Sequence, residues 1–236
     1  MNELEFYKEL EKLNINLTEI QKQQLSKYYD YLVEYNSHTN VTSITDKESV
    51  YLKHFYDSIL LSQTIDFNNI ENMLDIGCGA GFPGLVLKIV FPHIKLTLLD
   101  SNNKKTTFCK NLIDILNVEN VEVINNRAEE FINERREHYD LVTARAVKNL
   151  PVLIELSIPF VSINGQFIAM KADYEEELNN SLKGINILGG EYLTTKNINL
   201  PNNEGIRNFI IIKKIKKTDK KYPRQYNQIL KKPLYI

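Results

Sequence analysis

The sequence predicts an α/β fold: a mostly parallel, seven-stranded sheet that ends in an antiparallel hairpin and follows a helical extension. Three observations support this prediction. Short apolar runs alternate with amphipathic segments, which is typical of a parallel sheet covered by helices on both faces. A glycine-rich stretch, DIGCGAGFPG, joins the first of these runs to a helix. The last two runs are separated only by PNNEG, so we expect a hairpin there.

The predicted elements fall into a helical extension over residues 1–66, a core over 67–217 and a basic tail over 218–236. Thr18 and Gln21 form a capping-box pattern. The helices expected in the extension span 3–13, 18–36 and 47–62, the last with Asp46 as its N-cap, and a polar loop covers 36–45. The strands expected in the core span 72–77, 94–100, 121–126, 139–145, 165–172, 191–200 and 206–215, with helices over 83–91, 103–118 and 150–161.

The composition is that of an ordinary globular protein, with 236 residues of which 43% are hydrophobic and 25% charged. No apolar run approaches the roughly 18 residues that span a bilayer, and the acidic N-terminus does not resemble a signal peptide. We therefore expect a cytoplasmic protein with no membrane partner. The only cysteines, Cys78 and Cys109, lack the spacing of a metal site or a disulfide framework, so we expect no metal.

The two ends of the chain carry opposite charge. Residues 1–69 contain six Lys or Arg against eleven Asp or Glu, whereas residues 207–236 contain ten against one. A basic end indicates a polyanionic partner such as nucleic acid, but a solvated lysine-rich tail has the same composition. Charge alone leaves both interpretations open.

The glycine-rich stretch predicts a cofactor cradle between a strand and a helix. Asp75 precedes four glycines: Gly77, Gly79, Gly81 and Gly84. Glycines let the backbone approach a ligand closely, and the amides at the helix N-terminus face it. Asp100, 23 residues after Gly77, ends the next strand, where an acid can bind ribose hydroxyls. The alternative for Asp100 is a cap for the helix that follows.

NAD enzymes and S-adenosylmethionine enzymes share this layout, and three features favour the methyl donor. Asp75 stands where an acid can meet the ammonium of the cofactor's amino acid. The terminal hairpin is the usual ending of methyltransferase sheets. Only about 65 residues follow the fifth strand, too few for a separate dehydrogenase substrate domain. A dehydrogenase stays open as the weaker alternative.

Several segments together resemble the bacterial small-subunit ribosomal RNA guanine-N7 methyltransferases, the RsmG or GidB family. The resemblance covers nearly the whole chain. Its most specific parts are the FPG that continues the glycine loop, the A-R-A after the fourth strand and the P-R…K-K-P-L of the tail. Further matching segments are YLVEYNSHTNVTSIT, HFYDSI, LLDSNNKKTTF, NRAEEF, YDLVTARAV and MKA. The tail departs from the family in one respect, because RQYNQI stands where a glycine usually follows P-R.

The resemblance implies a class I, Rossmann-like methyltransferase that uses S-adenosylmethionine to methylate a guanine N7 in the decoding region of 16S rRNA. By motif, Gly77 and Phe82 line the cofactor, and Ala128 and Glu129 flank its adenine. Arg145 lies at the mouth of the active site, where the family pattern places an arginine beside the cofactor.

The residues agree with this chemistry. Guanine N7 carries a free lone pair, so no general base is required. The N/D-P-P-Y/F pattern of enzymes that methylate exocyclic amines is missing after the fourth strand, where A-R-A-V stands. Cys78 lies in the glycine loop and Cys109 within a helix, so both are interpreted as packing residues rather than as nucleophiles.

The remaining candidates have both structural and functional interpretations. Arg145 could position the target nucleotide or contact the cofactor, or it could merely pair with Asp140 or cap a helix. His54 and Asp57, one helical turn apart, are interpreted as a capping or inter-helix pair. Candidate RNA-phosphate contacts are Lys104, Lys105, Lys171, Lys220, Lys221, Arg224, Lys231 and Lys232.

The sequence thus predicts a monomeric methyltransferase whose partner is 16S rRNA or the small ribosomal subunit. A protein of ribosome assembly with a degenerate methyltransferase domain is the alternative from another class. The intact set of Asp75, the loop glycines and Asp100 argues against it.

Overall fold

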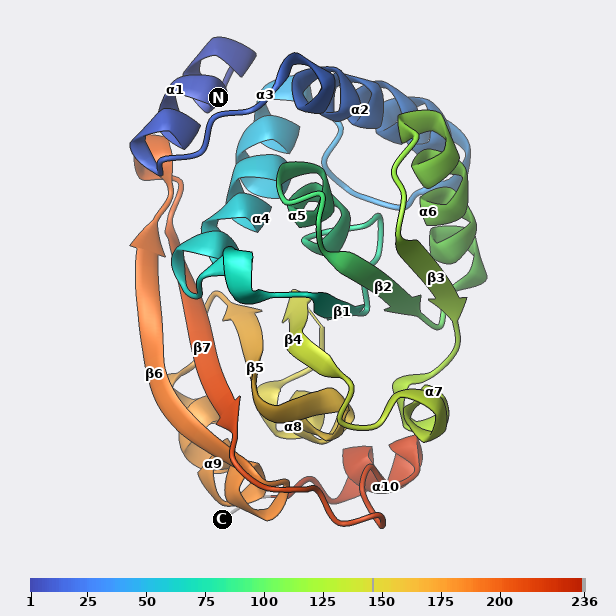
Figure 1. Ribbon diagram of the computed structural model, residues 1–236, viewed down its shortest axis with the longest axis vertical. Helices are drawn as coiled ribbons and strands as arrows, with labels where there is room; N and C mark the ends of the chain where they lie inside the picture. The colour runs from blue at the N-terminus through green and yellow to red at the C-terminus, as the bar shows by residue number, and fades with distance from the viewer. Residues whose placement is uncertain (146, 235–236) are drawn as a thin grey trace.

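The computed structural model describes residues 1–145 and 147–234, and these form the expected α/β architecture (Figure 1). Seven strands make one sheet in the order β3-β2-β1-β4-β5-β7-β6. β1 to β5 pair in parallel, whereas β7 is antiparallel to both β5 and β6, so the predicted terminal hairpin is confirmed. The strands are β1 (Asn72–Ile76), β2 (Lys95–Asp100), β3 (Val121–Asn125), β4 (Tyr139–Arg145), β5 (Val161–Lys171), β6 (Gly190–Asn199) and β7 (Ile206–Lys214).

Helices cover the sheet in two layers (Figure 1). One layer contains α1 (Glu3–Lys12), α2 (Glu19–Thr39), α3 (Lys47–Val50), α4 (Asp57–Ile59), α5 (Gly84–Val90) and α6 (Asn103–Leu116). The other contains α7 (Ala128–Arg135), α8 (Leu150–Ser157), α9 (Glu175–Ile187) and α10 (Tyr226–Lys231). The sequence analysis did not predict α7, α9 and α10, because they are short or carry few apolar residues.

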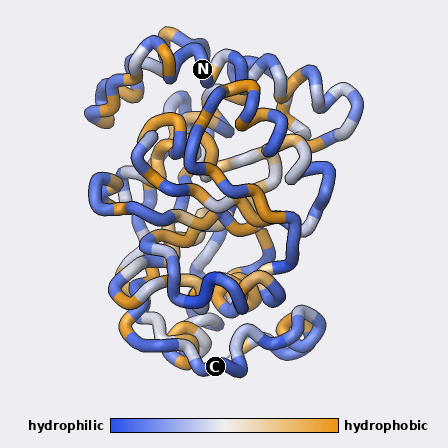
Figure 2. Tube along the Cα trace, turned by 45° about the vertical axis from the view of Figure 1, so that its right-hand side comes forward, coloured by the Kyte–Doolittle hydropathy of each residue, from blue (hydrophilic) through white to orange (hydrophobic). Residues whose placement is uncertain are grey.

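Strand residues alternate between the two layers, since successive side chains of a strand point to opposite faces. Met73 and Leu98 belong to the apolar cluster under the first layer. Their neighbours Leu74 and Leu99 belong to the cluster under the second. Figure 2 shows the result: hydrophobic segments gather in the interior and hydrophilic ones on the outer turns.

The N-terminal extension shares its core with the sheet. Phe6, Tyr51 and Phe55 are fully buried in the same cluster as the strand residues Leu98 and Ile168. We therefore regard residues 1–66 as part of one folded body rather than as an appendage.

The extension contains the expected helices with two differences. α2 continues to Thr39, into the predicted loop, and ends at Asn40, which adopts the left-handed conformation with φ 51°. The predicted helix over 47–62 is composite: a π-helical turn, Tyr51–Tyr56, joins α3 to α4, and a 3₁₀ turn, Leu60–Gln63, follows. The capping box of Thr18 with Gln21 and the N-cap at Asp46 are confirmed.

The basic tail also packs on the core. The Arg224 side chain donates to both carboxylate oxygens of Glu155 on α8, at 2.9 and 2.6 Å, and its backbone N–H donates at 2.8 Å. Ile229 of α10 is fully buried. No residue between 218 and 234 has a positive φ, so the backbone of this described stretch does not require the glycine found elsewhere in the family.

Within residues 1–145 and 147–234, no helix combines the length and apolar character needed to cross a bilayer.

Candidate active site

A cleft of about 650 Å³ opens at the carboxyl ends of β1 to β4, the edge where open parallel sheets place their ligands. Four strand-to-helix connections and the start of the chain converge on it. Its lining comprises Val41, Thr42, His54, Ile76, Gly77, Cys78, Gly79, Ala80, Phe82, Leu99, Asp100, Ser101, Lys105, Asn126, Arg127, Ala128, Glu129, Arg145, Val147, Lys148, Leu156 and Tyr226.

The glycine loop follows β1 with a backbone that favours glycine. Gly77, Gly79 and Gly81 have φ values of 69°, 58° and 89°. A Cβ at Gly79 would meet only the Gly77 oxygen, at 4.0 Å, so a side chain there would project into open space at the cleft. A Cβ at Gly84 would lie 2.9 Å from Asp75 and Leu98, so this glycine lets α5 pack closely on the sheet.

Tyr28 of α2 supports the same loop from the N-terminal layer. Its hydroxyl donates to the Ala80 carbonyl, and its ring stacks on Phe82 with centroids 5.2 Å apart. A Cβ at Gly81 would lie 2.6 Å from this hydroxyl, so Gly81 serves the packing of Tyr28 and is not part of the cleft lining. The first helices of the chain therefore fix the shape of the loop.

Asp75 lies behind the loop rather than on the cleft surface. It is fully buried, and one carboxylate oxygen accepts from the Gly84 N–H at 2.8 Å. The other oxygen has no partner. Burial raises the pKa of this carboxyl to about 7, because the charged form has lost its water. A contact between Asp75 and the cofactor's ammonium stays a prediction.

Asp100 faces the cleft at the end of β2. One oxygen accepts from the Gly79 N–H at 3.0 Å, and the other accepts from the Asn102 N–H at 2.8 Å. The N-cap of α6 is Asn102, whose side chain accepts from the backbone N–H groups of Lys104 and Lys105. The helix-cap alternative for Asp100 therefore does not hold. Asp100 instead ties the glycine loop to the start of α6, and each oxygen keeps a lone pair for a ligand.

Ala128 and Glu129 line the far wall of the cleft at the start of α7. Glu129 accepts from the Arg127 Nε at 2.6 Å, and the Arg127 guanidinium lies 4.4 Å from the centroid of the Tyr226 ring. The C-terminal helix α10 thus contributes a side chain to this wall, whereas the sequence had predicted only candidate RNA contacts in the tail.

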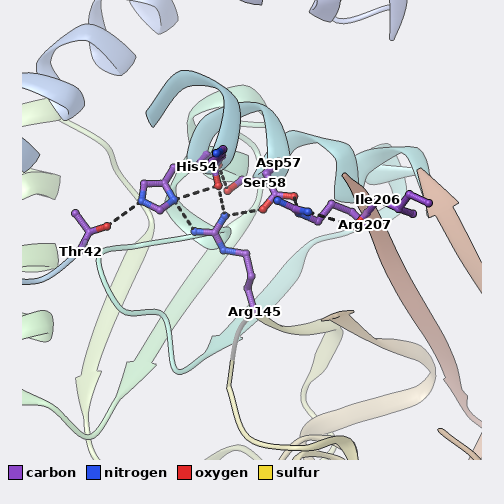
Figure 3. A network of polar contacts seen from close by, with 8 residues as sticks. Thr42, His54, Asp57, Ser58, Arg145, Ile206 and Arg207 are labelled. Carbon is purple, nitrogen blue, oxygen red and sulfur yellow. Dashed lines mark hydrogen bonds and ion pairs between the residues drawn. The ribbon is translucent and has the colours of Figure 1, made fainter. Parts of the chain in front are cut away.

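Arg145 extends from the end of β4 toward the π-helical turn (Figure 3). Its Nη1 donates to Asp57 Oδ2 at 3.0 Å and to the Lys53 carbonyl at 3.1 Å, and its Nη2 lies 3.2 Å from His54 Nδ1. The predicted pairing of Arg145 with Asp140 is wrong, because the Asp140 carboxylate accepts instead from the backbone N–H groups of residues 71 and 72. His54 and Asp57 are therefore not a simple capping pair.

His54 is neutral in this setting. Burial, and next the Arg145 charge, lower its pKa to about 3. Nδ1 lies 3.2 Å from the Arg145 Nη2 and 3.1 Å from the Lys53 carbonyl, and Nε2 lies 3.0 Å from the Thr42 hydroxyl, so both ring nitrogens have polar neighbours. A guanidinium can only donate whereas a carbonyl can only accept, so the tautomer decides which of the two Nδ1 binds. The His54 ring also stacks on Phe82, with centroids 4.3 Å apart. π-helical turns recur at functional sites, and this one presents two groups to Arg145, while Asp57 at the start of α4 presents the third.

A family model described as rRNA small subunit methyltransferase G matches residues 21–206. The ribosomal RNA small subunit methyltransferase G of Bacillus subtilis is 48% identical over 99% of both chains. The protein of the same name from Staphylococcus carnosus is 49% identical over 95% of both chains. The chain belongs to the rRNA small subunit methyltransferase G family.

Solved structures with low identity share the fold. The structure of M. jannaschii TYW2 in complex with AdoMet has a TM-score of 0.55 at 14% identity, over 72% of this chain and 77% of that one. The YcgJ protein of Bacillus subtilis has a TM-score of 0.51 at 15% identity, over 70% of this chain and all of the other. These neighbours support the architecture of the sheet.

The two cysteines are buried and free. Cys109 on α6 donates its thiol to the Gly79 carbonyl at 3.4 Å, and Cys78 lies 1% exposed in the loop itself. A hydrogen bond with Cys109, and then burial, raise the pKa of the Cys78 thiol, which disfavours the nucleophilic thiolate. Both observations agree with packing roles.

The candidate RNA-binding residues divide into three groups. Lys105 lines the cleft, and Lys104 is exposed beside it. Lys171 is 2.8 Å from Glu177 and donates to the Lys148 carbonyl, and Arg224 binds Glu155, so both are occupied within the protein. The four exposed lysines of the tail are Lys220, Lys221, Lys231 and Lys232.

Many residues of the cleft lining were not predicted from the sequence as site residues, among them Thr42, His54, Val147 and Tyr226. The segment that contains Thr42 was interpreted as a loop, and Tyr226 lies in a helix too short to show periodicity. The polar stretch directly before a buried helix is the one signal that could have placed Thr42.

Proposed function

We propose that this protein transfers a methyl group from S-adenosylmethionine to N7 of a guanine in 16S rRNA. The observation that carries the proposal is the cleft at the carboxyl edge of β1 to β4, which joins a glycine loop, Asp100 and Arg145 in a chain of this family. The substrate is the rRNA itself or a small ribosomal subunit. The enzyme acts as a monomer in the cytoplasm.

The residues present fit this cofactor. The space above Gly79 leaves the loop backbone open to a ligand, and Asp100 has lone pairs free for ribose hydroxyls. Ala128 and Glu129, on the wall beside Tyr226, are proposed to flank the adenine. Bound S-adenosylmethionine supplies a methyl group on a cationic sulfur, which makes that methyl electrophilic.

The protein's own contribution is alignment. Guanine N7 presents a lone pair and carries no proton, so no side chain has to act as a base. This agrees with the state of the groups at the cleft, since His54 is neutral but both of its ring nitrogens have polar neighbours. Arg145 is held at the mouth of the cleft and is proposed to position the substrates there.

The test uses an acceptor that lacks only the reacting atom. A 16S rRNA transcript, alone or assembled into small subunits, should accept label from S-adenosylmethionine, whereas a transcript made with 7-deazaguanosine should not. Label on the 7-deaza transcript would contradict N7 specificity. Asp100→Asn should weaken S-adenosylmethionine binding by about 1–3 kcal/mol in calorimetry, the scale of a charge-assisted hydrogen bond.

The alternatives predict different outcomes. A dehydrogenase would be stabilised against heat by NAD rather than by S-adenosylmethionine. A degenerate assembly protein would bind rRNA and respond to neither cofactor.

A further inference from the structure

Asp57 occupies an unusual electrostatic position, because two arginines share its carboxylate. Oδ2 lies 3.0 Å from the Arg145 Nη1, and Oδ1 lies 2.7 Å from the Arg207 Nε (Figure 3). Asp57 is 3% exposed and does not line the cleft, so no ligand touches it directly. Arg145 does line the cleft, and Arg207 is the second residue of strand β7, which is distant in the sequence.

The cleft has an excess of positive side chains among its described residues. Lys105, Arg127, Arg145 and Lys148 line it, against the carboxylates of Asp100 and Glu129. Such an excess suits an RNA phosphate but opposes a cationic sulfonium. Glu129 forms an ion pair with Arg127 at 2.6 Å, and Asp100 accepts a hydrogen bond from the Gly79 N–H of the glycine loop. Neither carboxylate is paired with Arg145.

Asp75 also feels the Arg145 charge, but it is not in contact with the guanidinium, and burial raises its pKa to about 7. Apart from Asp57, the groups in direct contact with Arg145 add no negative charge. His54 is neutral because burial and the Arg145 charge lower its pKa to about 3. The Lys53 contact is a backbone carbonyl, the Lys53 side chain pairs with Glu204 at 2.9 Å, and Phe82 offers only its ring, 5.2 Å from the guanidinium. Asp57 is therefore the carboxylate that balances Arg145.

We propose that Asp57 is the counter-ion of Arg145, and that it both aims the guanidinium and offsets its charge so that the cleft accepts a cationic cofactor. This inference rests on the proposed use of S-adenosylmethionine. Arg207 holds the second carboxylate oxygen and so fixes the direction in which Asp57 points. Asp57 acts through Arg145 and is a positioning residue.

The proposal makes a prediction that a purely structural role does not. S-adenosylmethionine is cationic at sulfur, whereas its product S-adenosylhomocysteine is neutral and otherwise nearly identical. Asp57→Asn would leave the Arg145 charge uncompensated, so it should weaken the cationic ligand more than the neutral one. Because both ligands carry the same amino acid carboxylate, a direct contact of that carboxylate with Arg145 cancels in the ratio of the two affinities.

The experiment measures the dissociation constants of both ligands by calorimetry for the wild type and the variants. In Asp57→Asn, the ratio of the S-adenosylmethionine constant to the S-adenosylhomocysteine constant should rise roughly tenfold, the order expected for one charge acting over several ångströms of partly screened protein. Adding Arg145→Met to Asp57→Asn should return the ratio to the wild-type value.

A second variant covers the case in which Asp57→Asn does not fold, since two partly buried arginines would then lack a partner. Asp57→Asn with Arg207→Met keeps the net charge of the wild type but still removes the carboxylate next to Arg145, so the ratio should rise by a smaller factor. Glu137→Gln is the matched control, because Glu137 partners buried Lys214 at 3.7 Å far from the cleft. It should lower stability and keep the ratio within about twofold.

A folded Asp57→Asn or Asp57→Asn/Arg207→Met protein with the wild-type ratio would overturn the proposal, and so would equal losses for both ligands. A wild-type protein that binds neither ligand would instead contradict the proposed function. The two failures are therefore distinguishable.

Discussion

The two ends of the chain both reach the cleft, but different forces hold them there. Residues 1–66 bury whole aromatic side chains: Phe6, Tyr28, Tyr51 and Phe55 are fully buried in the cluster that also contains the sheet. In the described part of the tail, Ile229 alone is an apolar side chain buried to that degree. The strongest polar attachment of the tail is the ion pair of Arg224 with the buried Glu155. Arg136 also donates to the Tyr222 carbonyl at 2.6 Å, and partly buried apolar side chains of the tail pack on the core.

This difference predicts two kinds of loosening. Apolar burial is spread over many contacts that also support the sheet, so its loss should unfold the whole protein. The ion pair of Arg224 acts on one segment, so its loss should loosen the tail while the rest of the protein stays folded. The first end therefore controls stability, and the second controls access to one wall of the cleft.

The largest effect is expected at Phe55. Its ring contacts those of Phe6, Tyr28, Tyr51 and Phe82, so Phe55→Ala should lower the free energy of unfolding by about 3–5 kcal/mol. Denaturant unfolding followed by circular dichroism measures it. Ile20→Ala, at a side chain 68% exposed, is the control and should change little. If Phe55→Ala lowered the free energy of unfolding by less than about 1 kcal/mol, aromatic burial in residues 1–66 would not control the stability of the protein.

The next effect is expected at the ion pair of the tail. Arg224→Met leaves the fully buried Glu155 carboxylate without its partner, which should destabilise the docked tail by about 3 kcal/mol. Amide exchange should accelerate in α10 more than in β1 or β4. Affinity for S-adenosylmethionine should fall too, because Tyr226 would leave the cleft. Lys231→Met, in the same helix, is the control and should change neither amide exchange nor cofactor affinity. If amide exchange in α10 were unchanged in Arg224→Met, apolar contacts would be what holds the tail.

A pH effect of intermediate size is expected at His54. Its pKa of about 3 lies below the value of about 6.5 in unfolded chains. As pH falls from 6.5 toward 3, His54 becomes protonated in the unfolded chain but stays neutral in the folded protein, so the free energy of unfolding decreases. Between pH 6.5 and 5 this amounts to about 2 kcal/mol.

Asp75 acts in the opposite direction in part of this range. Its carboxyl has a pKa of about 7 in the folded protein, so the folded state keeps a proton that the unfolded state loses as pH rises from about 4 to 7. Comparison of the wild type with His54→Gln isolates the histidine. The variant should lose less stability on acidification, and identical curves would mean that His54 is protonated in the folded state.

The smallest effect is expected from the exposed lysines of the tail. Changing Lys220, Lys221, Lys231 and Lys232 to Gln should leave the fold intact and make RNA binding less dependent on salt. The slope of log K against log salt should fall by up to about 0.7 for each lost contact to a single-strand phosphate. Deletion of residues 218–236 is a poor substitute, because it also removes Arg224. An unchanged slope would show that the tail does not contact RNA.

The sequence predicted the sheet well because its strands follow a local rule. Each apolar run indicates a strand by itself, and the glycines after the first run indicate a tight turn, so the strands and the cradle could be expected. Asp100, Ala128 and Arg145 could likewise be placed at the carboxyl edge, since every parallel strand ends there.

Contacts between distant segments could not be predicted in this way. Asp57 looks like an ordinary helix residue, and only the fold brings it to Arg145 and Arg207, which follow it by 88 and 150 residues. Asp75 has the position expected of a ligand contact, but the close packing of Gly84 turns its carboxylate into the interior. Burial and direction of a side chain are properties of packing, which a linear pattern does not contain.

The attachment of Tyr226 to the cleft also bears on how the protein is made. Translation delivers Thr42 first and Tyr226 among the last residues, and both line the same cavity. A nascent chain can bury its aromatic helices against the sheet before the tail has left the ribosome. We expect this wall of the cleft to form only when Arg224 docks on Glu155, so a product that stops short of Arg224 would carry the fold but an incomplete cleft.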